Sequence, residues 1–62
     1  MTSFEFRAAL AALNLRQSWL AERLGVNVTS VNRWATGRAV VPAYASFALE
    51  LLAQLGGASQ RS

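Results

Sequence analysis

Residues 17–34 read QSWLAERL, then G, then VN and VTSVNRW: two segments of helical spacing on either side of one glycine. In both segments apolar residues recur every three or four positions, which is the period of an amphipathic helix. Gly25 marks the end of the first segment, because glycine adopts the left-handed backbone conformation of a helix terminus without steric cost. The side chains expected to point inward are Leu20, Ala21, Leu24, Val31 and Trp34.

The spacing of these two segments is typical of a helix-turn-helix, in which two helices meet at a steep angle across a short turn. Ala21 is expected where the helices cross, since a larger side chain there would force them apart. The second helix of this motif lies in the major groove of DNA, so the sequence indicates a small DNA-binding protein. The alternative interpretation is that any two amphipathic helices joined by a glycine share this pattern, and the number of positions in register argues against it.

The fold class predicted for the whole chain is all-α, a compact bundle of four helices with five helices as the alternative. The helices are expected over residues 3–13, 17–24, 28–35 and 42–55. Gly56 and Gly57 should stop the last helix. The domain is therefore expected to span residues 1–57, followed by a polar tail over residues 58–62.

Local signals predict where the helices begin and end. Thr2 and Glu5 have the spacing of a capping box at the start of the first helix. Asn14 is expected to end that helix in a left-handed conformation, and Asn27 to cap the third helix through its side-chain oxygen. Pro42 suits the first position of the fourth helix, where its missing N–H costs nothing. The buried stripe expected on the first helix is Phe6, Leu10 and Leu13.

The fourth predicted helix is apolar around most of its circumference, so more than one of its faces should be covered. One broad side carries Tyr44, Phe47, Ala48, Leu51, Leu52 and Leu55, and Ala45 and Leu49 add apolar surface elsewhere. Either the domain buries the whole helix, or a second copy of the chain covers the remaining face about a two-fold axis, which is the interpretation we favour. The predicted homodimer interface consists of Tyr44, Leu49, Leu52 and Leu55.

Composition excludes several functional classes. The 62-residue chain has room for one hydrophobic core only, and it contains no histidine, cysteine or aspartate. It therefore lacks the usual general base and the usual metal ligands, so we expect no enzymatic activity, cofactor, metal or small-molecule ligand. No apolar run is long enough to span a membrane, and the first residues lack a secretory signal pattern, so a cytoplasmic protein is expected.

The net charge is +3, and every basic residue is an arginine. Four of the six arginines fall between Arg16 and Arg38, against the single carboxylate of Glu22. The planar guanidinium suits bidentate contact with phosphate or guanine. A solvated basic face without a partner would also explain the charge, but its concentration on the helix-turn-helix segment favours nucleic acid.

The chain resembles the phage repressor and Cro family of helix-turn-helix regulators over about residues 6–55. The motifs that carry this resemblance are Gln17-x-x-Leu-Ala21-x-x-Leu-Gly25-Val, Val31-x-x-Trp34, and Gly37-Arg38. The resemblance implies a lambda-repressor-like helical domain that binds a pseudo-palindromic operator in double-stranded DNA as a homodimer and represses transcription. Such a protein would lie on the nucleoid of a bacterial or phage-infected cell.

The resemblance also implies which residues contact DNA. Base reading is assigned to Val28, Thr29, Asn32 and Arg33 on the exposed side of the third helix. Arg33 suits guanine, Asn32 suits adenine, and the other two suit a thymine methyl group. Contacts to the DNA backbone are assigned to Arg16, Gln17, Ser18, Asn27, Thr36 and Arg38. In the family, the glutamine at the position of Gln17 also braces the recognition helix.

The sequence departs from the family pattern at two positions. Arg16 stands where a serine or threonine cap is usual, so the second helix should have a weaker cap and an added phosphate contact. Trp19 occupies a position that is normally polar, and three placements stay open for it: against the first helix, against the DNA backbone, or in an interface. A separate fifth helix is also not evident, so the fourth helix is expected to form the dimer.

The segment from Tyr44 to Ala53 additionally resembles the terminal helix of anti-CRISPR-associated repressors, which bind inverted repeats at an anti-CRISPR promoter. An anti-CRISPR operon is therefore one candidate target. The alternative function is a helical protein–protein interaction module, antitoxin-like or an adaptor, which would explain the apolar fourth helix but not the clustered arginines.

Overall fold

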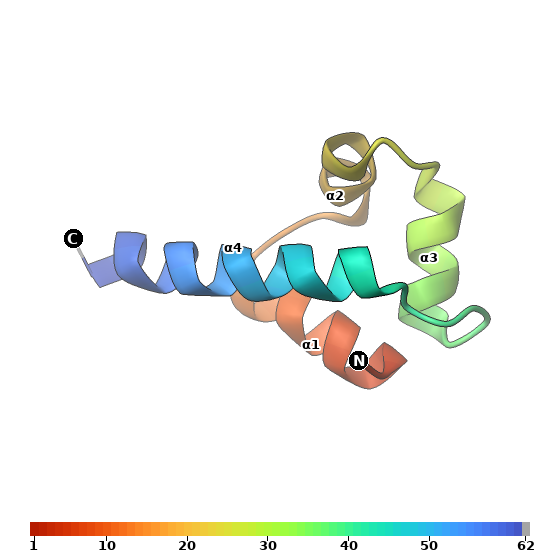
Figure 1. Cartoon of the computed structure of the whole chain (residues 1–62), viewed down its shortest axis with the longest axis horizontal. Helices are drawn as coiled ribbons and strands as arrows, with labels where there is room; N and C mark the ends of the chain where they lie inside the picture. Colours follow the sequence, from red (N-terminus) through yellow and green to blue (C-terminus); the bar gives the residue numbers. More distant parts are fainter. Residues whose placement is uncertain (62) are drawn as a thin grey trace.

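The computed structural model describes the backbone of residues 1–61 and the side chains of residues 1–55. Over these residues it contains four α-helices and no strand: α1 (Ser3–Leu13), α2 (Gln17–Leu24), α3 (Val28–Thr36) and α4 (Ala43–Arg61). Figure 1 shows α4 running along the length of the molecule, with α1 crossing it and with α2 and α3 gathered toward one end. The all-α prediction is confirmed, and the first three helices begin at the predicted residues.

The predicted caps explain these helix ends. Thr2 Oγ1 accepts from the backbone N–H of Glu5 at 3.0 Å, and Glu5 Oε1 accepts from that of Thr2 at 2.8 Å, which completes the capping box. Asn14 and Gly25 end α1 and α2 in the left-handed conformation, with φ of 57° and 72°. Asn27 Oδ1 accepts from the backbone N–H of Thr29 at 2.8 Å at the start of α3. Local sequence therefore fixes the first three helices.

The core lies between the four helices, each of which contributes buried residues. The five residues predicted to point inward from α2 and α3 do so: four are buried, and Leu24 is half-buried against them. Phe6 of α1 is fully buried and meets Trp34 edge to face, with ring centroids 5.9 Å apart. Trp34 in turn meets Tyr44 of α4 edge to face at 6.1 Å. Trp34 thus connects α3 to α1 and to α4.

The side of α4 that faces the core was left open by the sequence, and the structure decides it. Ala45 and Leu49 face the core, with 0% and 1% of their surface exposed, whereas Phe47 and Leu55 are 62% and 65% exposed. Because α4 is apolar on several sides, hydrophobicity alone could not select the buried side. Ala45 lies on the side that packs against the other helices, where a small residue permits close approach of two helices.

The predicted ends of α4 also differ from the structure. Pro42 lies just before the first helical residue, and its carbonyl accepts from the backbone N–H groups of Ala45 and Ser46. At the other end Gly56 and Gly57 do not stop the helix, which continues to Arg61. Glycine inside a helix costs about 1 kcal/mol relative to alanine but keeps its N–H donor, so it weakens a helix without breaking it.

The predicted polar tail, residues 58–62, falls on this extension. Its backbone is helical as far as Arg61, while Ser62 and the side chains of residues 56–62 lie outside the described part of the chain. None of the described helices is long and apolar enough to cross a membrane.

Candidate nucleic-acid interface

The outer face of α3 consists of exposed residues that share one side of the helix. Val28, Thr29, Asn32, Arg33 and Thr36 are all exposed, and they fall on one side because positions three and four apart are neighbours on a helix. The opposite side buries Val31, Trp34 and Ala35, at 0%, 6% and 1% exposure. All four residues predicted to read bases therefore lie together and are open to solvent. We call the five exposed residues, Val28, Thr29, Asn32, Arg33 and Thr36, the α3 outer face.

The first turn of α2 adjoins the α3 outer face. Asn32 Nδ2 donates to Gln17 Oε1 at 3.3 Å, which joins α3 to the first residue of α2. Asn32 keeps its Oδ1 acceptor and one Nδ2 hydrogen, which are the two groups needed to pair with adenine. Gln17 keeps its Nε2 donors for a phosphate oxygen. The hydrogen bond thus connects a residue predicted to read bases with one predicted to contact the backbone.

The start of α2 has unpaired donors. Arg16 is the N-cap residue, its side chain makes no cap hydrogen bond, and it is exposed together with Ser18. Backbone N–H groups in the first turn of a helix have no intrahelical partner, and they favour anions such as phosphate. The predicted weak cap is confirmed, and the Arg16 guanidinium is left free to extend toward a phosphate group.

The two remaining side chains at the ends of α3 are partly engaged within the protein. Asn27 uses Oδ1 to cap the helix, so its Nδ2 group is available as a donor. Thr36 Oγ1 donates to the carbonyl of Asn32 at 3.0 Å, which occupies its one hydrogen. A phosphate oxygen only accepts hydrogen bonds, so Thr36 would have to break this bond before its hydroxyl could contact DNA.

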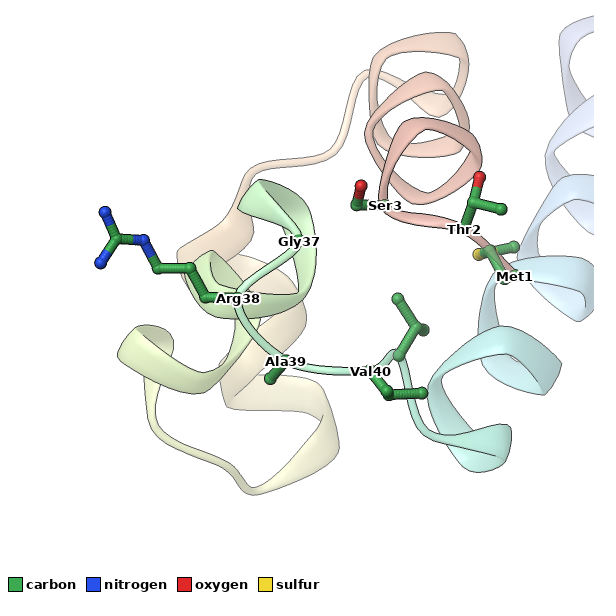
Figure 2. Close-up of a pocket in the computed structure, with 8 residues that line it drawn as sticks. Met1, Thr2, Ser3, Gly37, Arg38, Ala39 and Val40 are labelled. Atoms are coloured by element: carbon green, nitrogen blue, oxygen red, sulfur yellow. The ribbon is translucent and has the colours of Figure 1, made fainter.

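The segment after α3 leaves Arg38 projecting from the molecule. Gly37 has φ of 82°, and the backbone N–H groups of Arg38 and Ala39 both donate to the carbonyl of Arg33, at 2.9 and 3.2 Å. Figure 2 shows that this segment and the start of α1 border a shallow hollow, and that the Arg38 side chain points away from it. Arg38 therefore extends into solvent just beyond the end of α3.

Trp19 lies beside the α1–α2 connection. It is half-buried against the core, and it borders a hollow together with Asn14, Leu15 and Arg16. The guanidinium carbon of Arg23 lies 5.4 Å from the centre of its ring, a cation–π distance. Of the three placements left open by the sequence, the structure favours packing next to the end of α1.

One contact between α1 and α3 has no counterpart among the sequence-based expectations. Arg7 Nη1 donates to the backbone carbonyl of Ala35 at 2.6 Å. The two residues are 28 positions apart in the sequence. Because the contact joins two separate helices, no local signal in the sequence names the partner of Arg7.

The predicted dimer residues do not form one surface. Leu49 is 1% exposed and Leu52 is half-buried against the core, whereas Tyr44 and Leu55 are 51% and 65% exposed. The prediction for Leu49 is wrong, because the domain itself covers that side of α4. The exposed apolar side of α4, which we call the α4 flank, consists of Tyr44, Phe47, Leu51 and Leu55.

Comparisons with known proteins gave no assignment. No family model matches the chain, and neither a curated protein nor a solved structure matches it. Among the described residues, no group of three or more histidine, cysteine, aspartate or glutamate side chains is placed to hold a metal ion.

Proposed function

We propose that this protein is a sequence-specific DNA-binding transcriptional regulator that inserts the α3 outer face into the major groove. The observation that carries the proposal is the exposure of Val28, Thr29, Asn32 and Arg33 on one side of a helix whose opposite side is buried. A helix with this division packs against the core on one side and presents Thr29, Asn32 and Arg33 to solvent on the other. That is what reading base edges requires.

The proposed contacts divide into two kinds. Arg16 and the free amides at the start of α2 lie on one side of the α3 outer face, and Arg38 projects beyond its end. These groups would neutralise phosphates, which gives affinity that depends on salt but not on sequence. Arg33 would donate two hydrogen bonds to guanine, and Asn32 would pair with adenine.

We further propose that the protein binds DNA as a homodimer through the α4 flank. Four large apolar side chains on one helix are exposed there, and contiguous apolar patches on soluble proteins commonly mark interaction sites. Two copies related by a two-fold axis would present two α3 helices to an inverted-repeat operator. Occupying a promoter would exclude polymerase, so repression in the cytoplasm is the expected outcome, with an anti-CRISPR operon as one candidate target.

The DNA-binding proposal is tested by selecting duplexes from a random library with the wild-type protein. Arg33→Ala should cost about 1–3 kcal/mol on the selected site and much less on random duplex DNA. Arg23→Ala is the matched control, because Arg23 lies over Trp19 rather than on the α3 outer face. A library that yields no preferred sequence would contradict the proposal. Equal losses on both DNAs would mean that Arg33 contacts phosphate instead of a base.

The dimer proposal is tested by Leu51→Glu, measured by sedimentation velocity and circular dichroism. A charge on the α4 flank should produce monomers and leave the helix content unchanged, because Leu51 is 43% exposed in the single chain. Ala53→Glu adds the same charge to another exposed side of α4 and should leave the dimer intact. A Leu51→Glu protein that still sediments as a dimer would exclude this surface.

The α4 flank also favours a second candidate function, a protein–protein interaction module in which a different protein covers the flank. Random duplex DNA at low salt separates the two functions. A DNA-binding protein should retard the duplex, with retardation lost as salt increases, whereas an interaction module should show no retardation.

A further inference from the structure

The joint between α1 and the end of α3 is held by a charged hydrogen bond. Arg7 Nη1 donates to the carbonyl of Ala35, which is 1% exposed and lies one residue before the end of α3. The short distance, 2.6 Å, and the charged donor make this a strong hydrogen bond. The bond connects α1 to the last turn of the helix that we propose enters the major groove.

The end of α3 has backbone carbonyl groups that need a hydrogen-bond donor from outside the helix. The last four carbonyl groups of a helix have no intrahelical partner, and a cation near them is favoured by the helix dipole. At this end the carbonyl of Arg33 already accepts from Arg38 and Ala39, whereas the carbonyl of Ala35 has the Arg7 side chain. Arg7 therefore satisfies a carbonyl that the backbone turn after α3 does not reach.

A second contact at this joint comes from packing. A Cβ atom built on Gly37 would lie 3.3 Å from Ser3 Oγ and 3.7 Å from Ser3 Cβ, so the first turn of α1 lies directly against the segment after α3. Figure 2 shows Ser3 beside Gly37 and shows Arg38 directed away from this contact. The backbone that carries Arg38 is thus held by α1 from two positions.

We infer that Arg7 is a positioning residue for DNA binding, and the inference rests on the function proposed above. By holding the last turn of α3, Arg7 fixes where the following segment leaves the helix. It thereby sets the register between Arg33, which reads a base, and Arg38, which contacts the backbone. Arg7 itself touches no DNA in this arrangement.

A double-mutant cycle tests the inference on the duplex selected by the wild-type protein. Arg7→Gln should weaken binding on the order of tenfold, the size expected for a lost hydrogen bond to a charged group. In the Arg38→Gln background the same substitution should have a much smaller effect, because the residue that it positions is absent. Affinities are compared at a temperature and salt concentration where circular dichroism finds every variant fully folded.

The matched control is Arg23→Gln, which removes one positive charge without touching α3, and its effect should be equal in both backgrounds. Equal effects of Arg7→Gln in the two backgrounds would overturn the inference and make Arg7 an independent phosphate contact. A lower melting temperature with unchanged affinity would also overturn it, because Arg7 would then only stabilise the fold. If the wild-type protein selects no preferred duplex, the proposed function fails instead, which is a separate result.

Discussion

The α3 outer face and the α4 flank are both exposed, but they lie on helices of different character, since α3 is apolar mainly on one side and α4 on several. In α3 every apolar residue except Val28 falls on one side, so Val31 and Trp34 are buried while Asn32 and Arg33 are exposed. In α4 apolar residues lie on several sides, and the buried pair is Ala45 and Leu49 rather than the larger set that includes Phe47.

Amphipathicity therefore orients a helix only when one side is clearly polar. Where a helix is apolar on several sides, the neighbouring helices select which side is buried. The side that is left over is then available to a partner. In this protein that remaining side is the α4 flank.

The largest effect on stability is expected from removing a buried side chain on the core-facing side of α4. Leu49→Ala should lower the free energy of unfolding by about 2–5 kcal/mol, because it leaves a cavity in a core with little capacity to relax. Leu51→Ala, which removes the same number of atoms from the α4 flank, should cost much less in the monomer. Urea denaturation at a concentration where the chain is monomeric measures both. Equal losses would contradict the assignment of the two sides.

A smaller effect is expected at the turn that places the α3 outer face. Gly25→Val should lower the free energy of unfolding by about 1–3 kcal/mol, because a β-branched residue is strained at the φ of 72° found there. No atom lies within 4 Å of a Cβ built on Gly25, so the cost should come from the backbone alone. Gly25→Asn is the matched control and should cost less, since asparagine tolerates this conformation. An unchanged melting temperature for Gly25→Val would mean that the turn is not required.

The smallest effect is expected from acid acting on the capping box of α1. The backbone N–H of Thr2 donates to Glu5 and holds the pKa of this carboxyl below its ordinary value of 4.5, and the positive N-terminus acts in the same direction. Because the folded pKa is lowered, the stabilisation is present above the unfolded pKa and is lost as pH falls through the folded pKa. The wild-type protein should therefore lose more stability in acid than Glu5→Gln does.

Amide chemical shifts sharpen this prediction, because the first turn of α1 lies against the segment after α3. Acid titration should move the amide signal of Gly37, next to Ser3, more than that of Leu51 on the α4 flank. The shift of Gly37 should be reduced in Glu5→Gln. A Gly37 signal that titrates identically in both proteins would show that the capping box does not influence the end of α3.

The predictable part of the fold is local. Thr2, Asn14, Gly25 and Asn27 each act on neighbouring residues, and each behaves in the structure as its sequence position predicts. The same locality explains one error: Gly56 and Gly57 have a weak preference against helix, and α4 continues through them.

The candidate site was predictable as a list of exposed residues, but its connections were not. Val28, Thr29, Asn32 and Arg33 follow from the helical period of a single segment. The hydrogen bonds from Arg7 to Ala35 and from Asn32 to Gln17 join separate helices. Their geometry depends on how the helices pack, which the spacing of residues within one segment does not contain.

The order of residues is enough to predict an all-helical chain, the starts of the first three helices and the buried side of α3, because caps and apolar periodicity act over a few residues. The packing of the helices sets which side of α4 is buried and which arginine holds the end of α3. Both depend on contacts between helices, where shape and distance select among choices of similar hydrophobicity.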